Sequence, residues 1–169
     1  MIKLTIKSLF LLTFTHLISA EALANTPSFK VAVIENTQGN TELLTGKFSQ
    51  GVAKLAAKDQ SQQSFNISTG LCVAYLKSDL NEQAESACSL AIKQIESQPN
   101  QSPSKKYLTS LSYSNRGISR YVQDDVYGAL DDLTTAIIID NNPITQGNLK
   151  AAKQYLLKRS TNISKTLDH

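Results

Sequence analysis

Histidine is almost absent from this chain of 169 residues. Only His16 and His169 are present, one in a leader-like first segment and the other at the last position. The interior therefore lacks the side chain that most often serves as a general base or a metal ligand. Two cysteines are too few for a zinc site of the usual His/Cys kind. Neither a Gly-x-Ser-x-Gly motif nor a phosphate-binding glycine loop occurs. The sequence favours a protein that is not an enzyme and predicts no cofactor and no metal.

The chain also lacks an excess of charge of one sign. It carries 17 basic and 14 acidic residues, which gives a formal net charge of +3. Proteins that bind nucleic acid usually present a clustered basic face, and many that bind membrane surfaces carry a polybasic patch. Neither pattern is present in this sequence. We therefore expect no nucleic-acid partner.

Residues 1–24 have the pattern of a secretory signal peptide. Lys3 and Lys7 precede an apolar core at 9–18, and Ala22-Leu23-Ala24 supplies a small-x-small cleavage site. The core is too short for a stable membrane anchor, which is the alternative interpretation. No later stretch is long and apolar enough to cross a bilayer. We expect cleavage after Ala24 and a periplasmic or secreted protein that does not insert into a membrane.

The two cysteines are Cys72 and Cys88. In an exported protein the oxidising compartment favours one disulfide between them. The alternative is a pair of reduced, buried side chains that act as small apolar residues.

Apolar residues recur at helical spacing along most of the remaining chain, and no β-pattern of any length follows Ile34. The predicted fold class is therefore all-α. Residues 25–40 are expected to form a flexible lead-in segment, in which 31–34 fits either a helix start or a short strand. We expect helices at 41–45, 49–58, 65–77, 81–96, 104–122, 126–139 and 145–159, with a frayed tail at 160–169.

Two of the predicted hairpins carry small residues at matching positions. In each, the first helix has one small residue, the second helix has an alanine twelve positions later, and another alanine follows seven positions beyond. This spacing is typical of antiparallel helices whose backbones cross closely. The residues are Cys72, Ala84 and Ala91 in one hairpin and Gly117, Ala129 and Ala136 in the other.

The second of these hairpins resembles a tetratricopeptide repeat. The resemblance lies in Tyr113-Ser114-Asn115-Arg116-Gly117, followed by Ala129-Leu130-Asp131-Asp132-Leu133, Ala136 and Pro143. In that family a large residue and a small residue open the first helix, here Tyr113 and Gly117. The resemblance implies that Ala129 packs closest to Gly117, that Leu133 fills the hairpin, and that Ala136 touches the next repeat.

The resemblance covers residues 41–159, with a weaker match around Cys72 and a degenerate one around Gly46. It implies antiparallel hairpins stacked as a short right-handed superhelix with a C-terminal capping helix. A single hairpin of this kind cannot bury its apolar face, and about three repeats are needed for stability.

In this family the first helix of each hairpin lines the inner face of the superhelix. The resemblance therefore implies a groove of mixed apolar and polar character that takes an extended or helical peptide segment of a protein partner. The alternative is that several of these residues pack under the cap. The implied groove residues are Asn66, Thr69, Val73, Leu76, Lys77, Leu111, Ser114, Ile118, Tyr121 and Val122, and Asn148 and Tyr155 extend the strip on the last helix.

The charged residues of the second hairpin have structural interpretations. The family pattern suggests that Arg116 pairs with Asp132, and a ligand-binding arginine is the alternative. Asp124, Asp125, Asp131 and Asp132 lack the glycine and the closing glutamate of an EF-hand. Helix capping on a solvated face is therefore favoured over calcium binding.

These observations favour a non-catalytic protein–protein interaction module, that is, an exported scaffold or adaptor of the tetratricopeptide type. Two alternatives come from other classes: a structural helical subunit of an envelope complex, and a small helical enzyme or enzyme subunit. The missing interior histidine and the missing nucleophile motif weigh against the enzyme.

Overall fold

The computed structural model describes residues 28–34, 39–57 and 64–167, with side chains of the last helix as far as Ser160. The predicted signal peptide lies outside the described residues. The described residues form helices and no strand, so the predicted all-α class is confirmed. The helices are α1 (Asn40–Leu44), α2 (Phe48–Ala56), α3 (Phe65–Lys77), α4 (Asn81–Glu96), α5 (Pro103–Val122), α6 (Val126–Ile139) and α7 (Pro143–Leu167).

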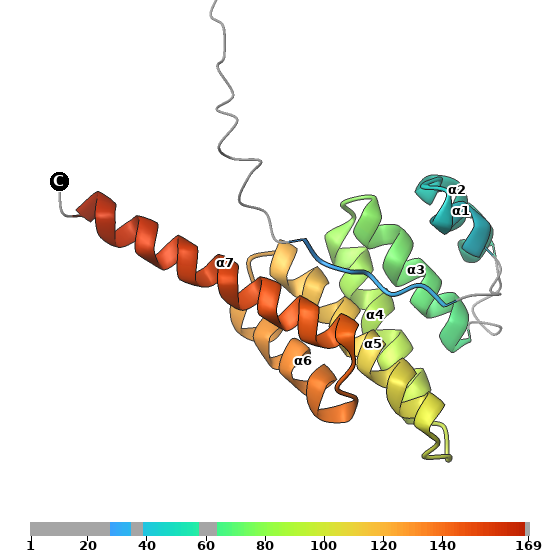
Figure 1. Ribbon diagram of the computed structural model, residues 1–169. Coiled ribbons are helices and arrows are strands. Elements are labelled where there is room, and N and C mark those ends of the chain that lie inside the picture. Colours follow the sequence, from blue (N-terminus) through green and yellow to red (C-terminus); the bar gives the residue numbers. More distant parts are fainter. Residues whose placement is uncertain (1–27, 35–38, 58–63, 168–169) are drawn as a thin grey trace, which may run out of the picture.

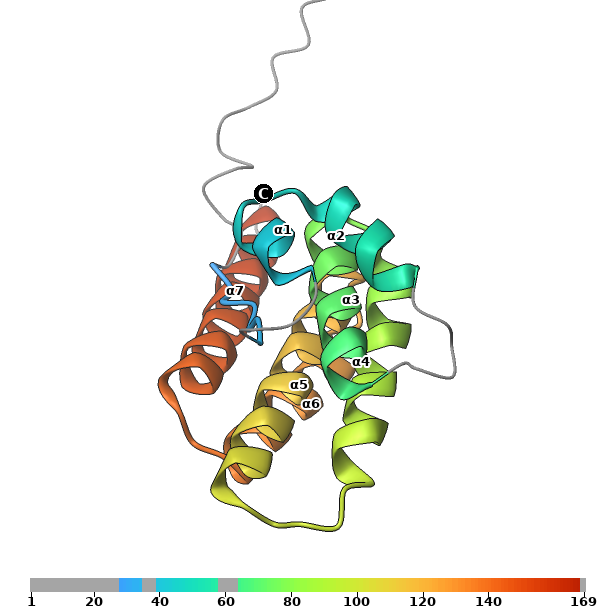
Figure 2. The ribbon, with the colours of Figure 1, turned by 90° about the vertical axis from the view of Figure 1, so that its right-hand side faces the viewer.

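The helices pair into hairpins that follow one another in chain order (Figures 1 and 2). The pairs are α1 with α2, α3 with α4, and α5 with α6. The second helix of each pair also packs against the first helix of the next, so that α2 contacts α3, α4 contacts α5, and α6 contacts α7. The first helices α1, α3, α5 and α7 touch one another in the same order. Each element therefore contacts its near neighbours in the sequence, which is the contact pattern of a linear stack.

The two long hairpins turn at aspartates with positive φ. Asp79 has a φ of 58° and Asp124 a φ of 64°, which lies in the left-handed region that Asp and Asn tolerate better than most residues. The Asp125 side chain then caps α6 by accepting a hydrogen bond from the Gly128 N–H at 3.0 Å. These short polar turns explain why α3, α4 and α6 begin and end where the sequence predicts.

Both helix ends at the α4–α5 loop are capped. Ser102 accepts a hydrogen bond from the Lys105 N–H, and Pro103 takes the first turn of α5, where its missing N–H costs nothing. The buried Lys105 ammonium donates to the carbonyl oxygens of Glu96 and Gln98 at the end of α4. A cation at this helix end is favoured by the helix dipole.

Small residues occupy the closest approach between α5 and α6. All four alanines of the predicted pattern are buried. A Cβ atom on Gly117 would lie 2.8 Å from Cγ of Leu133 and 3.1 Å from the carbonyl oxygen of Ala129. The two helices therefore approach this closely only because residue 117 has no side chain.

Cys72 of α3 and Cys88 of α4 form a disulfide with their Cα atoms 4.9 Å apart, so the predicted pairing is confirmed. The bond joins the two helices of one hairpin. In the chain-entropy description, closing a loop of this length contributes on the order of 3 kcal/mol to stability.

The last helix is longer than expected. We predicted a helix at 145–159 and a frayed tail at 160–169, but α7 runs from Pro143 to Leu167. Residues 160–167 contain no glycine and no proline, so no local signal ends the helix at Arg159. The end of α7 extends beyond the other helices (Figure 1). In the part of the chain that the structure describes, no helix combines the length and the apolar character needed to cross a membrane.

Candidate functional site

The residues predicted to line a groove lie on α3, α5 and α7, and most of them are not open to solvent. Six of them are only 1% to 8% exposed: Thr69, Val73, Leu76, Leu111, Ser114 and Ile118. Asn66, Lys77 and Val122 are exposed, Tyr121 and Tyr155 are partly buried, and Asn148 is buried. The predicted set is therefore not an open groove along its length.

Residues 28–34 of the same chain, called the docked segment below, lie against this face as an extended stretch (Figure 1). Oδ1 of Asn148 accepts a hydrogen bond from the Lys30 N–H at 2.8 Å, and Nδ2 of Asn148 donates to the Lys30 carbonyl oxygen at 2.9 Å. Asn115 makes the same pair of bonds with Ala32, both at 2.9 Å. This part of the predicted flexible lead-in is thus fixed against α5 and α7.

An asparagine amide matches the main chain of an extended residue. Its oxygen accepts from the N–H and its NH₂ group donates to the carbonyl of the same residue. Residues two apart in an extended chain direct these groups to the same edge. Lys30 and Ala32 are two apart, while Asn115 and Asn148 lie on successive first helices. Because the four bonds involve main-chain atoms, they do not depend on which side chains the segment carries.

The two amides are buried and need these partners. Asn115 is 1% exposed and Asn148 is 0% exposed. Nδ2 of Asn148 also donates to the hydroxyl of Ser114 at 2.8 Å, which links the amide to a residue of the predicted groove. A buried polar group left without a partner costs about 1–3 kcal/mol. If the segment leaves, water or another extended chain must therefore take its place.

Apolar side chains of the docked segment supply the rest of its contacts. Phe29, Val31 and Val33 pack against the main core cluster, which includes Val73, Leu76 and Ile118. The side chain of Ala32 is buried between them, whereas Lys30 is exposed. The segment therefore combines main-chain recognition with alternate apolar contacts.

Opposing terms of similar size hold the docked segment in place. Its four hydrogen bonds to the two amides contribute about 2–6 kcal/mol. Half-burial of its larger apolar side chains contributes about 3–6 kcal/mol. Fixing the backbone of the segment costs about 7–14 kcal/mol. Because these terms cancel to within a few kcal/mol, we expect the segment to leave the face far more readily than the hairpins unfold.

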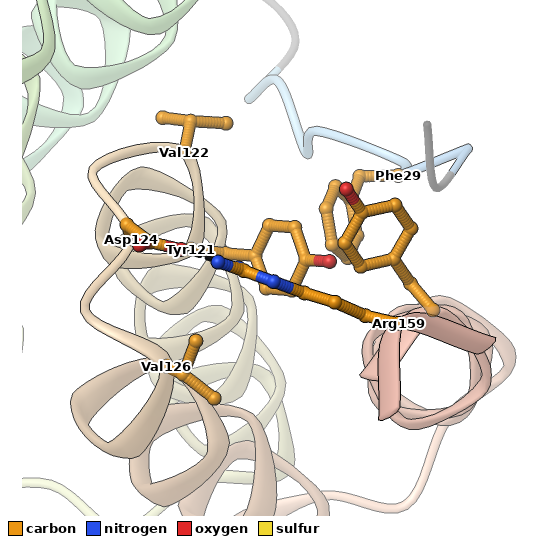
Figure 3. Close-up of a pocket in the computed structure, with 7 residues that line it drawn as sticks. Phe29, Tyr121, Val122, Asp124, Val126 and Arg159 are labelled. Carbon is orange, nitrogen blue, oxygen red and sulfur yellow. Dashed lines mark hydrogen bonds and ion pairs between the residues drawn. The ribbon is translucent and has the colours of Figure 1, made fainter. Parts of the chain in front are cut away.

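A pocket of about 340 Å³ lies beside Phe29, between the turn that follows α5 and the last helix (Figure 3). The rings of Phe29, Tyr121 and Tyr155 meet edge to face, with centroid distances of 5.0 Å and 5.7 Å along this series. Arg159 of α7 reaches Asp124 with an N···O distance of 2.8 Å. We call this the aromatic pocket; Val122 and Val126 complete its lining.

The Tyr121 hydroxyl is the polar group of the aromatic pocket that lacks a partner. Its oxygen is buried and forms no hydrogen bond with any described residue. Burial raises the pKa of Tyr121 to about 12, so the phenol keeps its proton at neutral pH. It is therefore available to donate one hydrogen bond to a group that enters the pocket.

Arg116 and Asp132 form the pair that the family pattern suggests. Nε and Nη2 of Arg116 donate to the two carboxylate oxygens of Asp132 at 2.8 Å and 2.7 Å. Nη1 of Arg120 lies 3.0 Å from the same carboxylate. Hydrogen bonding to Asp132 raises the pKa of the Arg116 guanidinium. These contacts join α5 to α6, which favours a structural role over a ligand-binding arginine.

The acidic run has contacts of the same structural kind. Asp124 pairs with Arg159, Asp125 caps α6, and Asp132 pairs with Arg116. Across the described ranges, no group of three or more histidine, cysteine, aspartate or glutamate residues is placed to hold a metal ion.

Sequence reasoning missed Asn115 and the docked segment. Phe29, Val31 and Val33 alternate with less apolar or smaller residues, which is the period-two signal of an extended strand. Asn115 stands about one repeat length before Asn148, which we had placed on the groove. These two signals together could have located the site.

Comparison of the chain with protein-family models, with curated proteins and with solved structures found no match.

Proposed function

We propose that this protein is a non-catalytic protein–protein interaction module that binds an extended segment of a partner. We further propose that its hairpins form a short right-handed superhelix of the tetratricopeptide type, capped by α7. The stacking order of the helices supports this arrangement, as does the close approach of α5 and α6 at Gly117.

We propose that the protein works in the periplasm or after secretion. The signal-like pattern at 1–24 supports export. The disulfide between Cys72 and Cys88 is compatible with an oxidising compartment.

The observation that carries the proposal is the pair of asparagine clamps. Asn115 and Asn148 each hold the N–H and the carbonyl of one extended residue, and both amides are buried. Such a site recognises main chain, so its natural ligand class is an extended polypeptide. The neighbouring groups are a phenol, hydroxyls and apolar side chains, which suit binding and orientation.

A photo-crosslinking experiment tests this function. A photoreactive amino acid replaces Val122, which lines the aromatic pocket and is 49% exposed, in the exported protein in cells. A matched control carries the same group in place of Ile138, which is 79% exposed on α6. We expect a defined protein to be crosslinked from position 122 and not from position 138. Equal products from both positions, or none from position 122, would contradict the proposal.

A further inference from the structure

We infer that the docked segment is an internal ligand that an external peptide displaces, and that this peptide has an aromatic residue, then an apolar residue two positions on, then a small residue. This inference rests on the proposed function, because it specifies the ligand of the same face. The partner is an extended segment of another protein.

The main-chain clamps make the segment exchangeable. Asn115 and Asn148 bind only N–H and carbonyl groups of Ala32 and Lys30. Any extended chain offers the same groups at residues two apart. The docked segment therefore shows the backbone path that a partner peptide takes.

The side chains of the segment define which peptides fit. Ala32 is buried between the clamps, so a larger side chain at this position meets packed atoms. Phe29 stands edge to face with Tyr121 and packs with Val31 against the core cluster. Lys30 is exposed, so the position between the aromatic and apolar residues accepts many side chains.

The aromatic pocket gives an external peptide contacts that the docked segment leaves unused. A tethered segment competes at a high effective concentration, on the order of millimolar, so an equal peptide in solution loses to it. A partner whose chain continues past the Phe29 position enters the pocket and reaches the unpartnered Tyr121 hydroxyl with a hydrogen-bond acceptor. That additional contact lets the partner displace the segment.

The test measures binding of a fluorescent peptide with the sequence of residues 28–34 to the full mature chain. Ala32→Glu and Phe29→Ala each weaken the docked segment and leave both clamps in place. Ser28→Glu is the matched control, because it adds the same charge at an exposed position of the segment. We expect affinity for the peptide to rise on the order of tenfold or more in the first two variants and to stay at the parent value in Ser28→Glu.

Specificity is measured with a second peptide that carries leucine in place of the alanine. We expect Phe29→Ala protein to bind it on the order of tenfold more weakly than the first peptide. Circular dichroism checks folding, and Phe29→Ala carries the comparison if Ala32→Glu does not fold. Equal binding of the first peptide by parent and variants overturns the internal ligand, and equal binding of both peptides overturns the small-residue rule.

Further outcomes separate this inference from the proposed function. A partner crosslinked from position 122, with no peptide bound by any folded variant, overturns the inference and leaves the interaction module standing. Peptide binding as expected, with no crosslinked partner, supports the internal ligand and contradicts the module's function in cells. A parent dimer in light scattering that Ala32→Glu abolishes overturns the external partner in favour of a second copy of this chain.

Discussion

Adding one methyl group at Gly117 tests the packing of α5 on α6. In an open helix position, replacing glycine with alanine stabilises by about 0.5–1 kcal/mol. At Gly117 the new Cβ would lie 2.8 Å from Cγ of Leu133, which is fully buried, and 3.1 Å from a main-chain oxygen of Ala129. Neither neighbour is the free end of a flexible side chain. Overpacking of this kind costs about 1–3 kcal/mol, so we expect Gly117→Ala to destabilise by about 1–2 kcal/mol.

Gly147 provides the matched control for this experiment. It lies in α7, and a Cβ there meets no atom within 4 Å. Gly147→Ala should therefore stabilise by up to about 1 kcal/mol, opposite in sign to Gly117→Ala. Urea unfolding of the parent and both variants, with the disulfide intact, measures the two changes. If Gly117→Ala is as stabilising as Gly147→Ala, the facing of α5, and with it the position of Asn115, is wrong.

Three further predictions concern other bonds of the fold. Reduction of the disulfide should lower stability by about 3 kcal/mol in thermal melts, and an unchanged melting temperature would argue against a constraining bond. Asp132→Asn should cost about 3–5 kcal/mol in urea unfolding, because it leaves Arg116 without its buried counter-charge, and a loss below about 1 kcal/mol would show that the pair is dispensable. Burial raises the pKa of Tyr113 and of Tyr121 to about 12, above the ordinary value of 10. The folded state then holds these protons more tightly, so the associated stability is complete below about pH 10 and is lost as the pH rises towards 12. Absorbance titration should show two of the six tyrosines ionising late, and a single transition near 10 for all of them would be inconsistent with this burial.

Local sequence patterns located the hairpins well. The predicted bounds of the helices at 65–77, 81–96 and 126–139 agree with α3, α4 and α6. These helices have a clear apolar period, and short turns that contain Asp79 or Asp124 separate them from their partners. Both signals act within a few residues, so the sequence displays them directly.

The candidate site was harder to predict because its contacts are distant in sequence. The Lys30 N–H is bound by a side chain 118 positions away, and the Ala32 N–H by one 83 positions away. The docked segment has no neighbouring strand that would make its period-two pattern part of a longer β-signal. Its extended form comes from two amides that reach it only after α5 and α7 have stacked. The length of α7 was missed for a different reason, since no capping or breaking residue follows Arg159 to mark an end.

Residue-resolved amide hydrogen exchange along the docked segment tests the central claim most directly. The N–H groups of Lys30 and Ala32 donate to the asparagine clamps, whereas those of Val31 and Val33 donate to no described residue. The account predicts alternating protection, with exchange at residues 30 and 32 slowed several-fold or more relative to residues 31 and 33. Uniform exchange along the segment would contradict the clamps, and with them the site from which the function is inferred.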